Sequence, residues 1–79
     1  MTMEEWKGIF AKRLSYSIER SGLSKKEVAE LANISPGTIS QYLNCTNIPT
    51  ATVVSNLAHV LKVDIDYLLV FEEVVERTT

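Results

Sequence analysis

The sequence predicts an all-α fold, a compact bundle of five helices within a chain of 79 residues. Apolar residues recur at spacings of three and four, and residues that cap helices stand before each apolar run. The composition, 46% hydrophobic and 23% charged, is typical of a globular chain. A chain this short buries only about 60% of its unfolded surface. We therefore expect one shared core in a single domain spanning 1–79.

The first helix is predicted over 3–21, and Gly22 should end it because glycine adopts the left-handed conformation of a helix C-terminus without strain. An apolar stripe with a spacing of four should face the core. Lys7, Lys12 and Arg20 are expected on the outer, solvated side. The stripe consists of Trp6, Phe10, Leu14 and Ile18, with Ile9 beside them.

Two short helices joined by a tight turn are predicted over 24–43. Ser24 and Glu27 have the spacing of a capping box at the start of the first, and Asn33 should end it. Ser35 and Pro36 suit the N-cap and first position of the second. The expected core faces are Val28, Ala29, Leu31 and Ala32 in the first helix, and Ile39, Tyr42 and Leu43 in the second.

The outer face of the second helix is polar but carries no charge. It is formed by Gly37, Thr38, Ser40, Gln41 and Asn44. Such a face can enter the major groove of DNA and contact base edges. It can equally be the solvated side of an ordinary helix, and the residues alone leave both interpretations open.

Two further helices are predicted over about 50–62 and about 64–76. Thr50 and Asp64 are their expected N-caps. Ile65, Leu68 and Leu69 should point inward. Beyond them the apolar residues continue among acidic ones, which is more apolar surface than five short helices need. These extra residues are Val70, Phe71, Val74 and Val75.

An ordered set of residues from about Phe10 to Leu69 resembles the phage-repressor and Cro type of helix-turn-helix DNA-binding domain. The resemblance implies a lambda-repressor-like fold with its motif at about 24–43. No single residue is diagnostic, but the set is specific at these spacings. It comprises Gly22-Leu23-Ser24, Ala29, Ile34-Ser35, Thr38-Ile39-Ser40, Asn44, Pro49, Leu57-Ala58, Leu61-Lys62-Val63 and Leu68-Leu69.

The resemblance also implies which residues contact DNA. Positions facing bases correspond to Pro36, Gly37 and Gln41, with Ser40 also within reach. Gln41 is the side chain suited to an adenine, through N6 and N7. Phosphate contacts are implied for Lys25, Lys26, Thr38 and Asn44.

The sequence departs from the family pattern in ways that weaken DNA binding. Pro36 and Gly37 cannot make bidentate base contacts, and the chain has no Lys or Arg between Lys26 and Lys62. Base reading should therefore be modest per half-site, or lost. The net charge is −2, but residues 1–40 carry +1 and residues 41–79 carry −3. The acidic excess thus falls in the half that the family places away from DNA.

A homodimer interface at Val70, Phe71, Val74 and Val75 would use the extra apolar residues, and the family commonly dimerises through this end. The alternative is a longer helix folded back on the first helix and Trp6. We expect double-stranded DNA as the partner.

No membrane span, cofactor, metal site or small-molecule ligand is expected. The single cysteine and the acidic N-terminus fit a cytoplasmic protein.

Two functions follow, and neither is enzymatic because no catalytic constellation is visible. The first is a small sequence-specific transcriptional repressor that binds a two-fold operator as a homodimer. The second is a helix-turn-helix scaffold that binds another protein, as the partner or antagonist of another regulator. The resemblance favours the first function. Three features favour the second: the absence of Lys and Arg between Lys26 and Lys62, the Pro36-Gly37 pair, and the acidic C-terminal half.

Overall fold

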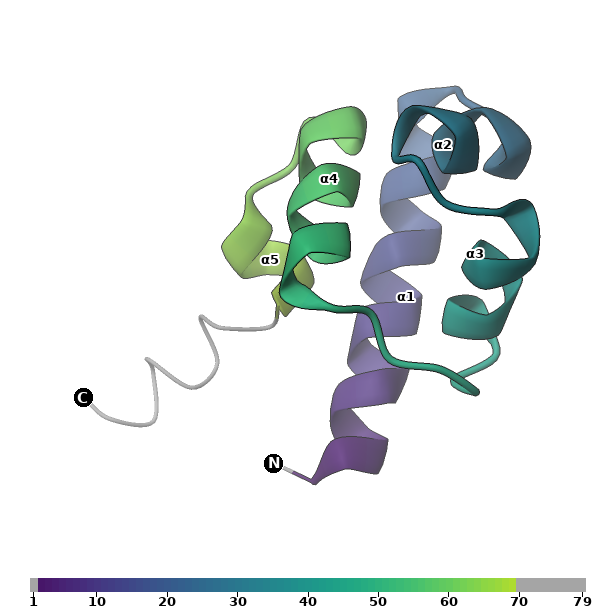
Figure 1. Cartoon of the computed structure of the whole chain (residues 1–79). Coiled ribbons are helices and arrows are strands. Elements are labelled where there is room, and N and C mark those ends of the chain that lie inside the picture. The colour runs from purple at the N-terminus through teal and green to yellow at the C-terminus, as the bar shows by residue number, and fades with distance from the viewer. Residues whose placement is uncertain (1, 70–79) are drawn as a thin grey trace.

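The computed structural model describes residues 2–69, which form five α-helices and no strand. The helix α1 (Met3–Ser21) runs through the middle of the molecule (Figure 1). In that view α2 and α3 lie on one side of α1, and α4 and α5 lie on the other. The prediction of an all-α fold is confirmed. The remaining helices are α2 (Lys25–Leu31), α3 (Pro36–Leu43), α4 (Ala51–Leu61) and α5 (Ile65–Leu69).

Side-chain caps begin α1 to α4. The hydroxyls of Thr2, Ser24, Ser35 and Thr50 each accept a hydrogen bond from the backbone N–H three residues later. Each cap satisfies one of the N–H groups that a helix start leaves without an intrahelical partner. The predicted caps Ser24, Ser35 and Thr50 are confirmed. Glu27 also completes its capping box by accepting from the Ser24 N–H at 2.9 Å.

Left-handed residues close several helices. Gly22 has φ +76° and Asn33 has φ +62°, as predicted for residues that end helices. Lys62 ends α4 with φ +58°, and Cys45 follows α3 with φ +62°. Cys45 therefore occupies a left-handed position, which glycine would adopt without strain.

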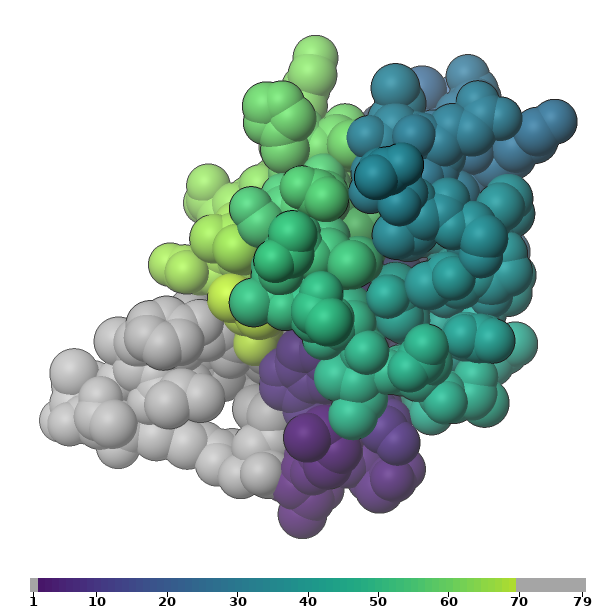
Figure 2. Space-filling view, in the orientation of Figure 1, coloured from purple at the N-terminus to yellow at the C-terminus, as the bar shows by residue number. Residues whose placement is uncertain are grey.

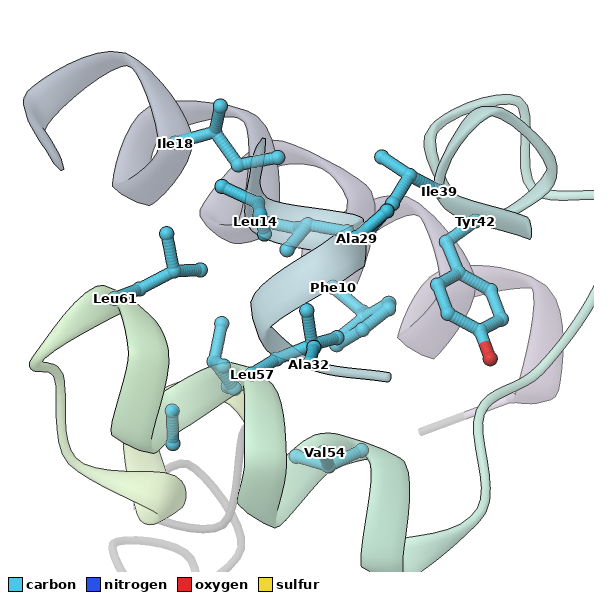
Figure 3. Close-up of a cluster of buried hydrophobic side chains, with 13 residues drawn as sticks. Phe10, Leu14, Ile18, Ala29, Ala32, Ile39, Tyr42, Val54, Leu57 and Leu61 are labelled. Atoms are coloured by element: carbon cyan, nitrogen blue, oxygen red, sulfur yellow. The ribbon is translucent and has the colours of Figure 1, made fainter. Parts of the chain in front are cut away.

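One apolar core joins all five helices (Figure 3). Leu14 of α1, Ile39 of α3 and Leu57 of α4 are fully buried at its centre. Ala29 is also fully buried, and α2 and α3 make their contact in this region. The core members are Phe10, Leu14, Ile18, Val28, Ala29, Ala32, Ile39, Tyr42, Val54, Leu57, Ala58, Leu61 and Leu68.

Two predicted core positions are wrong. Leu31 is 64% exposed, because neighbouring residues on a helix are turned by about 100° and Ala32 beside it faces the core. Val28, Ala29 and Ala32 together fill the inward face of α2, which leaves Leu31 outside it. Ile65 is 38% exposed in the first turn of α5, where Leu68 is the buried residue.

Two side chains of α1 hold α5 in place. The Trp6 Nε1 donates a hydrogen bond to the Leu69 carbonyl at 2.9 Å. The Arg13 guanidinium donates to the Tyr67 carbonyl at 2.6 Å and stacks 4.7 Å from the centre of the Tyr67 ring. Two residues of α1, Trp6 and Arg13, thus hold α5 by its backbone carbonyls.

The predicted continuation of this helix to about residue 76 lies outside the described residues. So does the predicted dimer interface at Val70, Phe71, Val74 and Val75. Within residues 2–69, no helix is long and apolar enough to cross a membrane.

Candidate nucleic-acid interface

The turn between α2 and α3 sets the angle of α3. The Ile34 N–H donates to the Ala29 carbonyl at 2.9 Å, and the Asn33 N–H donates to the Glu30 carbonyl at 3.2 Å. These bonds close the end of α2, and left-handed Asn33 then reverses the chain. Because Ile34 is half-buried against the core, the start of α3 is held against the rest of the domain.

The exposed side of α3 gathers the residues expected to face bases. Pro36, Gly37, Ser40 and Gln41 are all exposed, whereas Ile39 and Tyr42 on the opposite side are buried. The space-filling view shows the surfaces of α2 and α3, in blue and teal, lying next to each other on one side of the molecule (Figure 2). The structure therefore brings the predicted base-facing residues together on one solvent-facing surface.

The N-terminal turn of α3 carries little side-chain bulk. Pro36 supplies no N–H, and a Cβ built at Gly37 would meet only the Ser35 Oγ, at 3.9 Å. Packing within the molecule therefore does not require glycine here. The Thr38 N–H donates to the Ser35 Oγ at 3.1 Å, and the two hydroxyl oxygens lie 2.7 Å apart. Since that contact uses one hydroxyl hydrogen, the other is left to donate to a ligand.

Lys25 and Lys26 occupy the first positions of α2 and are exposed. Glu27 follows them, and its hydrogen bonds from Ser24 lower the pKa of its carboxyl group. The carboxylate is thus negative at neutral pH and partly offsets the two cations. An anion bound here would also benefit from the positive end of the α2 dipole.

Lys12 is a cation whose position the sequence did not reveal. It lines the same shallow surface depression as Lys25, together with Glu19 of α1 and Leu43 of α3. The sequence predicted only that Lys12 is solvent-exposed. Its place in the depression lined by Lys25 and Leu43 follows from tertiary packing, in which α1 contacts α3. The spacing of lysines along the chain carries no signal for this proximity.

The loop after α3 binds back to Gln41. The Thr46 N–H and hydroxyl donate to the Gln41 backbone carbonyl at 2.9 and 3.1 Å. The Asn47 Nδ2 donates to the Gln41 side-chain Oε1 at 3.1 Å. Asn44, a predicted phosphate contact, is exposed and caps α3. The contact between Asn47 and Gln41 was not predicted from the sequence.

Other reactive side chains do not form a site within the described part of the chain. No group of three or more His, Cys, Asp or Glu in residues 2–69 is arranged to hold a metal ion. The Cys45 thiol is half-buried and donates to the Lys7 carbonyl at 3.6 Å. His59 is exposed on α4.

Comparison with known proteins finds a match to one family model and matches among solved structures. A family model described as helix-turn-helix matches residues 14–68. The solution structure of the SOS-response transcriptional repressor LexA from Eubacterium rectale is similar, with a TM-score of 0.77 and 26% sequence identity. The similarity covers 87% of this chain and 73% of that one. No curated protein sequence matches the chain.

Proposed function

Because this chain belongs to the helix-turn-helix family of DNA-binding transcription regulators, we propose that it is a small repressor that binds a two-fold operator as a homodimer. The observation that carries this proposal is the exposed polar face of α3, opposite its buried residues Ile39 and Tyr42. A helix of this kind fits the major groove with its N-terminal half against base edges.

In this proposal the residues of α3 have different roles. Pro36 and Gly37 carry little side chain, so the start of the helix can approach the floor of the groove closely. Gln41 and Ser40, both exposed, contact base edges. Thr38 lies in the first turn of the same helix and Asn44 is its C-cap. The Thr38 hydroxyl and the Asn44 carboxamide bind phosphate oxygens.

The cations of α2 supply the electrostatic part of binding. Lys25 and Lys26 are exposed, and neither forms an ion pair with another residue in the 2–69 range. They can therefore neutralise phosphates without first breaking an ion pair within the described part of the domain. With few cations and few base contacts, one protomer should bind weakly. Two protomers on half-sites about 34–36 Å apart would combine their contacts.

We place the homodimer interface at Val70, Phe71, Val74 and Val75. These residues follow Leu69 directly, and the Trp6 hydrogen bond to Leu69 ties that point of the chain to α1. In the sequence, α4 and α5 separate them from α2 and α3. An interface there would leave the α3 surfaces of both protomers available to DNA.

A second function, binding to another regulatory protein, rests on a specific observation. Leu31 is 64% exposed on α2, close in sequence to the turn that leads into α3. A leucine side chain offers no charge or hydrogen bond to a phosphate backbone, but it can be buried against the apolar surface of a protein partner. This alternative accounts for the absence of Lys and Arg between Lys26 and Lys62.

An NMR titration of the amide signals with a generic duplex of about 20 base pairs at low salt separates the two functions. Electrostatic binding to phosphates does not depend on base sequence, so a generic duplex is sufficient. Shifts at Lys25, Gly37, Thr38 and Gln41 that fade as salt is raised would support DNA binding. A folded protein with no shift at these residues would refute it and favour a protein partner. Signals of α4, such as those of Asn56, provide the internal control.

A further inference from the structure

Gln41 of α3 and Asn47 of the following loop form a pair of hydrogen-bonded carboxamides on the surface of the domain. Both side chains are exposed, and Gln41 lies on the proposed base-reading face of α3. The Asn47 Nδ2 donates to the Gln41 Oε1 at 3.1 Å. A free glutamine on a helix surface samples many side-chain rotamers, whereas this one is attached to the loop that follows its own helix.

The direction of this hydrogen bond is set by the backbone. The Asn47 Oδ1 accepts the Ile48 N–H at 2.9 Å, so the other end of the Asn47 carboxamide, its NH₂ group, must face Gln41. An NH₂ group only donates, and the Gln41 atom that it meets must therefore be the carbonyl oxygen. The Ile48 N–H thus determines the orientation of both carboxamides.

The Gln41 backbone is held from the same loop. The Thr46 N–H donates to the Gln41 backbone carbonyl at 2.9 Å, and the Thr46 hydroxyl donates to it at 3.1 Å. Gln41 is thus held twice by this loop: Thr46 binds its backbone carbonyl and Asn47 binds its side-chain oxygen. The loop holds the Gln41 oxygen on the side of Asn47 and leaves the Gln41 NH₂ group without a partner within residues 2–69.

We propose that Asn47 is a positioning residue that makes Gln41 select guanine. A glutamine reads adenine by accepting from N6 and donating to N7, and this needs its oxygen and nitrogen to face the base together. Here the oxygen is directed to Asn47, so the two N–H groups of Gln41 are presented to the base. Guanine offers two acceptors, O6 and N7, at the corresponding edge. The base therefore differs from the adenine expected for an unattached glutamine.

This inference rests on the proposed function, and selection from a random duplex library by the full-length protein tests both. The Gln41→Ala variant identifies the base position that Gln41 reads, because preference should disappear there. At that position the wild-type protein should prefer guanine over adenine by about fivefold or more, the ratio expected for one good base contact. The Asn56→Ala variant removes an exposed carboxamide on α4 and should keep the wild-type preference.

Two variants of Asn47 test the positioning role. Asn47→Ala releases Gln41 and should reduce the guanine preference to about twofold or less, or convert it to adenine. In Asn47→Asp one carboxylate oxygen can still accept from Ile48, but the other can only accept from the Gln41 NH₂ group. Gln41 should then turn its oxygen to the base and favour adenine or cytosine, whose amino groups donate. A purely structural role of Asn47 would lower affinity for every sequence without changing the preferred base.

The outcomes separate the inference from the function. A wild-type preference for adenine, a preference left unchanged in both Asn47 variants, or no position that responds to Gln41→Ala would each overturn the inference alone. Failure of the folded wild-type protein to enrich any DNA sequence would overturn the proposed repressor, and the inference with it.

Discussion

The salt dependence of DNA binding should report how many lysines contact phosphate. Each phosphate neutralised on B-DNA contributes about −0.9 to the slope of log K against log salt concentration. Lys25 and Lys26 are the exposed cations at the start of α2, so one protomer should show a slope of about −1.8. Raising the salt concentration from about 50 to about 200 mM should then weaken binding about twelvefold.

The substitution Lys25→Ala should reduce the slope to about −0.9 per protomer and the loss of affinity to about 3.5-fold. Alanine is tolerated at a helix start and removes a cation from the positive end of α2, so the fold should persist. Fluorescence anisotropy of a labelled generic duplex over a salt series gives the slope directly. Circular dichroism of the variant checks that it is folded.

A matched control is Lys62→Asn, which removes a cation at the end of α4. Asparagine tolerates the left-handed backbone of Lys62, which has φ +58°, so the substitution should be neutral for folding. Its slope should equal that of the wild type. A Lys25→Ala slope equal to the wild-type slope would refute the phosphate role of Lys25. A wild-type slope near −2.7 would instead include Lys12, which shares a surface depression with Lys25.

Three predictions concern stability. Leu14→Ala should lower the free energy of unfolding by about 2–5 kcal/mol, because Leu14 is fully buried, whereas Leu31→Ala should change it by less than about 0.5 kcal/mol. Urea unfolding followed by circular dichroism measures both, and equal losses would contradict the assigned burial. Glu27→Gln keeps an acceptor for the Ser24 N–H but no charge. Since the folded pKa of Glu27 is lowered, its stabilising effect is present above its unfolded pKa and is lost as the pH falls through the folded value. The stability difference between wild type and this variant should therefore shrink between about pH 7 and about pH 3, and a constant difference would argue against the charged cap. Burial raises the pKa of Tyr42, so the stability that it provides is present below its unfolded pKa of about 10 and is lost as the pH rises through the folded value. Tyr42→Phe should extend the folded range to higher pH in an alkaline titration, and an unchanged alkaline midpoint would contradict this.

Several features of the candidate interface were predictable because they depend on residues close together in the chain. The caps at Ser24, Ser35 and Thr50 connect groups three residues apart, so the sequence contains both partners. Left-handed closure at Gly22 and Asn33 depends on the residue itself. Burial of Ile39 and Tyr42 follows from helical periodicity, and it exposes the opposite side of α3.

Other features required the packed structure. Leu31 ends α2 and Ala32 is its C-cap; both are apolar, and only the direction of the core decides that Ala32 is buried while Leu31 is 64% exposed. Lys12 lines the same depression as Lys25 and Leu43 in the packed structure, in which α1 contacts α3. Arg13 holds the Tyr67 carbonyl, 54 residues away in the chain. Periodicity describes the faces of one helix at a time and cannot indicate which faces of different helices meet.

The sequence by itself thus determined where the helices begin and end, and which polar residues share the outer face of α3. These properties follow from hydrogen bonds and side-chain directions within one or two turns of helix. The tertiary structure decided which groups on that face are free to bind. It attached Gln41 to Asn47 through a loop that left-handed Cys45 turns back towards α3, and it brought Lys12 and Lys25 to the same surface depression. Such contacts depend on the relative placement of helices and loops, which is set only when the common core forms.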